Sequence, residues 1–182
     1  ARVRALVNDL EFWAPAASLP IVRLSGLPAG VAGLWSLWRI EVSAHEWRRQ
    51  RFLPLFIHDD GRILAPTARR AWELLLAHQP IVIGEVTSEA AAALAQNARQ
   101  HAETQGMPIH QELRHEYQRF LNRLREKTAY AFTPRQRAVD RIGLPEVRLH
   151  RLALLRQEEA TWQAELEQRT TTTAALDPLL FM

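Results

Sequence analysis

The residues that could perform chemistry are seven histidines, a pair of neighbouring aspartates and several groups of arginines. His101, His110 and His115 fall in one helical stretch, but their offsets of nine and five do not place them on a common face. Zinc normally requires ligands at suitable helical spacing together with a third ligand. Asp59 and Asp60 precede a glycine, and aspartates in such a turn usually bond nearby backbone groups. We therefore expect neither a metal site nor a catalytic acid pair.

Signatures of nucleophilic catalysis and of nucleotide binding are absent from the sequence. It contains no cysteine, so a thiolate nucleophile is excluded, and no serine stands in a nucleophile-elbow motif. The glycines at 26, 30 and 33 are not followed by the Lys-Ser/Thr pair of a phosphate-binding loop. We expect a segment that is not an enzyme by itself and holds no cofactor. An enzyme of unrecognised type ranks below the other hypotheses, because no acid, base and nucleophile converge.

Arginine is the remaining functional signal. Of the 23 basic residues 22 are arginine, Lys127 is the sole lysine, and the net charge is +3. Such a bias is typical of a GC-rich genome, yet a guanidinium group also binds phosphate with a planar fork. The alternative to nucleic-acid contact is a set of solvated faces balanced by nearby glutamates. The nucleic-acid-binding candidates are Arg48, Arg49, Arg51, Arg69, Arg70, Arg135, Arg137 and Arg141.

Composition predicts a soluble cytoplasmic protein without a membrane partner. At 182 residues and 47% hydrophobic content the chain can bury one core and carry a projecting element. No apolar run reaches the roughly 18 residues that span a bilayer. Residues 1–10 alternate arginine and apolar positions, unlike a signal peptide. A start at alanine and an apolar stretch over 177–182 predict a piece of a longer polypeptide.

The first half predicts a small antiparallel meander. Residues 34–42 are dense in aromatic and β-branched side chains, which favours a strand buried on much of both faces. Residues 51–58 form a second strand, and the turn at 59–61 leads to a third at 62–64. A helix follows Pro66 and ends at Pro80. Three shorter elements are a helix over 1–13, a strand over 21–24, and a strand or connector over 81–83.

The six tryptophans favour core packing. Trp35 and Trp38 are three positions apart and should therefore point to opposite faces of their strand. A base-stacking platform on the sheet is the alternative, although the aromatic pattern matches no recognised RNA-binding module.

The second half predicts an antiparallel helical arm. One helix begins near Glu89, with Gly106 and Pro108 as points where it could kink or break. Thr133 and Pro134 read as an N-cap and first helical position, so they predict the start of a new short helix. The last helix begins at Pro145. The expected coiled-coil stripes are Ile109, Leu113, Tyr117, Phe120, Leu124 and Ala131 in the first helix, and Leu152, Leu155, Glu159, Trp162 and Leu166 in the last.

These elements together predict an α+β fold with a small antiparallel sheet and a long helical arm. The expected organisation is an α/β unit over 1–86, the arm over 87–170, and a linker with a final strand over 171–182 that returns to the sheet.

The order of these segments resembles the C-terminal accessory region of bacterial Snf-type, RapA-like ATP-dependent helicases and translocases. The segments that carry the resemblance are GLWSLWR at 33–39, RFLPLF at 51–56, DGR at 60–62, PTARRAWE at 66–73, WQAE at 162–165 and LDPLL at 176–180. The motor residues of that family, its phosphate-binding loop and acidic magnesium-binding box, are absent, so no catalytic role transfers to any residue here.

The resemblance implies a non-catalytic module that contacts double-stranded DNA, a partner protein through the arm, or the motor domains of the same chain. ATP and magnesium would belong to the parent protein. The alternative is a protein-interaction scaffold with a coiled-coil arm and no nucleic-acid role.

Overall fold

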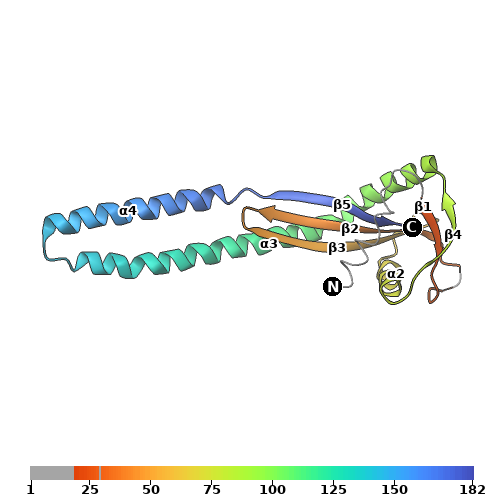
Figure 1. Cartoon of the computed structure of the whole chain (residues 1–182), viewed down its shortest axis with the longest axis horizontal. Helices are drawn as coiled ribbons and strands as arrows, with labels where there is room; N and C mark the ends of the chain where they lie inside the picture. The colour runs from red at the N-terminus through yellow and green to blue at the C-terminus, as the bar shows by residue number, and fades with distance from the viewer. Residues whose placement is uncertain (1–18, 29) are drawn as a thin grey trace. The chain divides into compact units, whose positions relative to one another are not determined.

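Antiparallel sheets of two and three strands combine with helices in the part of the chain that the structure, a computed structural model, describes: residues 19–28 and 30–182. The α+β class predicted from the sequence is confirmed (Figure 1). The helix predicted over 1–13 lies outside the described residues. The elements are β1 (Leu19–Arg23), β2 (Gly33–Ala44), β3 (Trp47–His58), α2 (Ala65–Ala77), β4 (Ile81–Val86), α3 (Ser88–Asp140), α4 (Pro145–Gln168) and β5 (Thr173–Phe181).

The described residues form two compact units. The first comprises residues 19–41, 50–110 and 175–182, and the second comprises Val42–Arg49 and Gln111–Ala174. The first unit therefore holds most of the strands with α2, whereas the second holds α4, the turn between β2 and β3, and the later part of α3.

The three-stranded sheet has the order β3-β2-β5 and is covered on both faces. Side chains along a strand alternate between faces, and β2 uses both. Trp35 packs with Ala71 of α2 on one face, whereas Trp38 packs with Ala98 of α3 and Phe181 of β5 on the other. The predicted strand buried on both faces, with its two tryptophans pointing in opposite directions, is confirmed.

The third strand of the sheet is β5, so the prediction of a third strand at 62–64 is wrong. Only Ile63 pairs there, in a single bridge to Ile57 of β3. Leu64 is already the N-cap residue of α2, and Pro66 occupies its first turn. Proline presets the backbone for a helix, so too few residues remain for a strand. The predicted return of the final strand to the sheet is confirmed by β5.

Strands β1 and β4 form the two-stranded antiparallel sheet, in which Leu19 pairs with Val86 and Arg23 pairs with Ile81. This pairing resolves the apolar run at 81–83 as part of a strand. Ile81, Val82 and Ile83 nevertheless remain more than half exposed, at 63%, 58% and 53%.

Helix α3 runs from residue 88 to residue 140 without interruption, so the new helix predicted at Thr133 and Pro134 is wrong. Pro134 is exposed, and its missing N–H removes one hydrogen bond from the helix. The Thr133 hydroxyl donates to the Ala129 carbonyl at 2.9 Å, which is how threonine is accommodated inside helices. The helix therefore continues through the proline, although the local sequence signals a stop.

Gly106 also lies inside α3 and is buried. A Cβ atom there would lie 2.9 Å from Cδ1 of Ile40. The glycine therefore permits close approach of the helix to the sheet, which offsets its poor helix propensity.

We expect Gly33→Ala to destabilise the first unit by about 2–4 kcal/mol. A Cβ atom at this position would lie 2.2 Å from the Ile57 carbonyl oxygen and 2.8 Å from the His58 Cα, so β3 would have to move. Urea unfolding followed by tryptophan fluorescence measures the change.

Gly143→Ala is the matched control, because an added Cβ there meets nothing within 4 Å. Its free energy of unfolding should stay within about 1 kcal/mol of the wild type. Equal effects of the two substitutions would show that the close contact at Gly33 does not matter.

Candidate nucleic-acid interface

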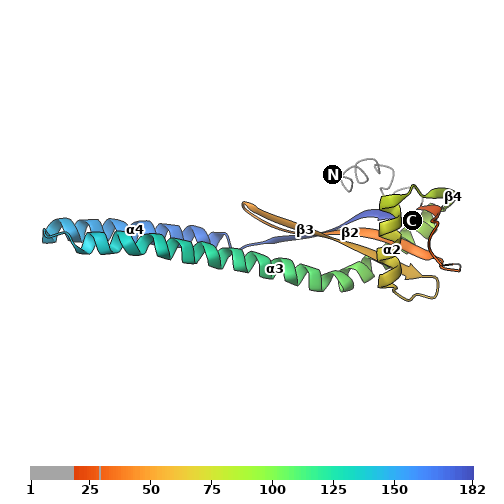
Figure 2. The same cartoon turned by 90° about the horizontal axis from the view of Figure 1, so that it is seen from below.

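Helices α3 and α4 lie side by side and antiparallel in the second unit (Figure 2). Leu113, Tyr117 and Leu121 of α3 are buried, as are Leu155 and Leu166 of α4. These side chains fix the inward face of each helix, so the opposite faces are free to carry polar groups.

Tyr117 is the best anchored residue of this packing. Its ring lies 4.9 Å from the ring of Trp47 and 6.1 Å from that of Phe120, measured between centroids. Its hydroxyl donates a hydrogen bond to the Arg169 carbonyl at the C-cap of α4. Burial raises the pKa of the Tyr117 hydroxyl above its ordinary value, so the group stays protonated and remains a donor.

The stripe predicted for α3 is correct at Leu113 and Tyr117 but wrong at Ala131, which is exposed. Thr128 and Phe132 are the half-buried residues in this region. An α-helix has 3.6 residues per turn, so a strict seven-residue repeat drifts around its surface. The inward face therefore moves to Phe132 near the end of the helix. Coiled-coil packing itself stays a prediction.

The eight arginines predicted from the sequence are divided between the two units. Three lie in the first unit, namely Arg51, Arg69 and Arg70, and five in the second, namely Arg48, Arg49, Arg135, Arg137 and Arg141. All eight are exposed.

Several of them have partners within their own unit. Arg70 forms an ion pair with Glu73 at 3.1 Å. The Arg49 guanidinium lies 5.9 Å from the centre of the Trp47 ring, a cation–π distance. Arg135 forms an ion pair with Glu158 of α4 at 2.5 Å and lies over the ring of Phe132. Arg135 therefore contacts the neighbouring helix α4, so its role differs from that of Arg137 and Arg141.

Because α3 is continuous, the row of cations along it is longer than the one predicted from the sequence. The basic face consists of Arg119, Arg123, Lys127, Arg137 and Arg141, which are all exposed. The successive offsets are four, four, ten and four residues, which at 3.6 residues per turn keep the five positions within about 80° around the helix axis. Within the part of the chain that the structure describes, none of these five forms an ion pair.

Of these five, only Arg137 and Arg141 are among the candidates predicted from the sequence. A helix break at Pro134 would rotate the two halves of the row away from each other, whereas one helix keeps them in phase. From Arg119 to Arg141 the row extends about 33 Å at 1.5 Å per residue, close to one turn of a DNA duplex.

Positive charge is concentrated in this part of the chain. Residues 119–151 hold nine of the 23 arginine and lysine residues and three of the 20 acidic residues, a formal charge of +6. All other residues together hold 14 basic and 17 acidic groups, which gives −3. The modest total of +3 therefore conceals a basic segment joined to a mildly acidic remainder.

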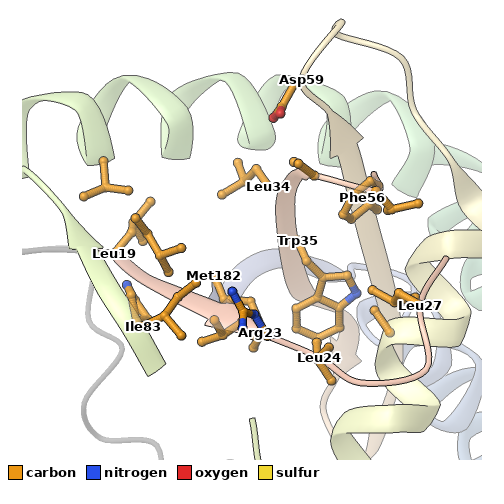
Figure 3. A pocket seen from close by; sticks show the side chains of 18 of the residues that line it. Leu19, Arg23, Leu24, Leu27, Leu34, Trp35, Phe56, Asp59, Ile83 and Met182 are labelled. Carbon is orange, nitrogen blue, oxygen red and sulfur yellow. The ribbon is translucent and has the colours of Figure 1, made fainter. Parts of the chain in front are cut away.

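The first unit contains an apolar pocket of about 500 Å³. Figure 3 shows Leu19 and Ile83 on one side, Phe56 and Leu27 on the other, and Trp35 between them. Arg23 and Asp59 are the charged residues among those described that line it. The volume falls in the range of small-molecule sites.

Of the two aspartates in the predicted turn, Asp60 bonds locally as expected. Asp60 accepts hydrogen bonds from the Arg62 backbone N–H at 3.0 Å and from the Arg62 side chain at 2.6 Å. The backbone bond from Arg62 is the main cause that lowers the pKa of the Asp60 carboxyl below its ordinary value.

Among the residues that the structure describes, no group of three or more histidine, aspartate or glutamate residues is placed to hold a metal ion. No helix in the same part of the chain combines the length and apolar character that crossing a bilayer requires.

No protein-family model, curated protein or solved structure matches the chain.

Tyr117→Phe should destabilise the second unit by about 1 kcal/mol. The substitution keeps the ring against Trp47 and removes only the hydrogen bond to the Arg169 carbonyl. Thermal unfolding followed by circular dichroism at 222 nm measures the loss. Tyr130→Phe is the control, because Tyr130 is 80% exposed, and an unchanged Tm for Tyr117→Phe would refute a stabilising bond.

Proposed function

We propose that this chain is a non-catalytic accessory module of an ATP-dependent DNA helicase or translocase. In this proposal the basic face of α3 binds the phosphate backbone of double-stranded DNA. The motor domains belong to the same parent protein and supply ATP hydrolysis with magnesium. As part of this proposal, the protein acts in the cytoplasm.

The observation that carries the DNA contact is the basic face itself. Four exposed cations follow one side of α3 and Arg141 directly follows its last residue, and none of the five forms an ion pair among the described residues. Cations of this kind displace counterions from a polyanion, and that release drives sequence-independent binding. Four of the five are arginines, whose planar forks suit phosphate oxygens.

The link to a motor rests on the resemblance of the segment order to RapA-like accessory regions. A chain of two compact units suits a module in which one unit touches DNA and the other contacts the motor. No nucleotide-binding signature is needed in the segment for this role.

The second candidate function is a protein-interaction scaffold without a nucleic-acid role. Exposed apolar side chains near the start of α4 favour it, since Leu144 and Leu149 are 67% and 66% exposed. In that case the arm would dock on a protein partner, and the basic face would be a solvated surface.

Charge reversal tests the DNA contact. Arg123→Glu/Arg137→Glu should reduce affinity for a 20-base-pair duplex at least tenfold at 100 mM salt, measured by fluorescence anisotropy. For five phosphate contacts the slope of log K against log salt should be about −4.5, and the variant should flatten it by about 2. The new glutamates stand four residues from Lys127 and Arg141, an arrangement that preserves the helix.

Arg114→Glu/Arg125→Glu is the matched control. It makes the same change in net charge on the same helix, but Arg114 and Arg125 stand at offsets that place them off the basic face. A loss of affinity within about threefold is expected. Equal losses for both variants would mean that total charge, and not this face, determines binding.

The motor link is tested in the natural full-length protein. We expect DNA-stimulated ATP hydrolysis that loses most of its stimulation when residues 111–174 are replaced by a short linker. Hydrolysis without DNA should persist, because the motor lies elsewhere. Full-length protein without any ATPase activity would remove the helicase hypothesis and favour the scaffold.

A further inference from the structure

Tyr130 interrupts the basic face with an exposed aromatic ring. Its side chain is 80% exposed, the highest value among the large hydrophobic residues described. No ring contact or hydrogen bond of this side chain occurs among the residues that the structure describes. The ring therefore contributes little to packing, so packing does not explain why an aromatic residue stands at this exposed position.

Tyr130 lies midway between the arginines of the basic face. Arg123 and Arg137 stand seven residues before and after it, and Arg119 and Arg141 stand eleven residues before and after it. Offsets of seven and eleven return to the same side of an α-helix. The aromatic ring is thus centred among four arginines, about 10 Å from the nearer pair along the helix axis.

An exposed aromatic ring flanked by cations is the combination with which proteins bind unpaired bases. Tyr130 with Arg123 and Arg137 on either side of it provides both components.

We propose that Tyr130 stacks on an unpaired base, so that the arm prefers DNA with a single-stranded segment, such as a fork, over a blunt duplex. This inference rests on the proposed function and names its substrate class. The flanking arginines bind phosphates on either side of the unpaired nucleotide. A base inside an intact duplex is already stacked on its neighbours, so the tyrosine gains no contact there.

Three DNA ligands test the inference with the chain as it stands: a blunt 20-base-pair duplex, a fork with two single-stranded tails, and a 20-nucleotide single strand. Tyr130→Ala should weaken binding of the fork and the single strand at least fivefold. Its affinity for the blunt duplex should stay within twofold. Tyr130→Phe should bind all three ligands as the wild type does, because stacking needs the ring and not the hydroxyl.

Leu149→Ala is the control for loss of an exposed apolar side chain on the arm, since Leu149 is 66% exposed and lies on α4. It should change none of the affinities by more than twofold. A fork carrying 2-aminopurine at single tail positions gives a second readout, because stacking quenches its fluorescence with wild type and Tyr130→Phe but not with Tyr130→Ala.

The outcomes separate the two proposals. If duplex binding depends on the basic face while Tyr130→Ala weakens all ligands equally or none, the stacking inference is overturned and the accessory function stands. If the wild type binds none of the three ligands, both are overturned.

Discussion

The packing of α3 against α4 determines what the outer surface of α3 can do. Leu113, Tyr117 and Leu121 are buried on one side of the helix, and helical geometry then assigns every other residue to a face. The hydrogen bond from Tyr117 to the Arg169 carbonyl adds a fixed point at the end of α4. The basic face exists as a single row because this packing holds residues 111–140 in one continuous helix with one phase.

The strands could be predicted well because their signals are local. The aromatic and β-branched run that became β2 indicates burial on both faces before any partner is known. The failures involve choices that neighbouring elements decide. A third strand at 62–64 competes with the start of α2, and Pro66 tips that choice toward the helix. Strand β5 pairs with β2 although the two strands are more than a hundred residues apart in the sequence.

The candidate site, too, could be predicted only in part from local sequence signals. Arginine composition predicts phosphate binding, and the predicted basic clusters include Arg137 and Arg141. Thr133 and Pro134, however, locally predict the end of one helix and the start of another. Proline inside a helix costs about 3 kcal/mol, so a break is the reasonable local prediction. The structure shows that the helix continues, and just beyond the proline Arg135 forms an ion pair with Glu158 of α4. Arg119 and Arg123 join the same row only when that continuity is known.

Neighbouring cations on the basic face repel one another. Like charges four residues apart destabilise a helix by about 0.2–0.5 kcal/mol per pair. Arg119 with Arg123, Arg123 with Lys127, and Arg137 with Arg141 make three such pairs. The helix dipole offsets this only near the C-terminus of α3, where Arg137 lies. A polyanion along the row would turn each repulsion into an attraction. Alternating charges would remove these repulsions, and under the proposed function a phosphate-rich ligand offsets them instead.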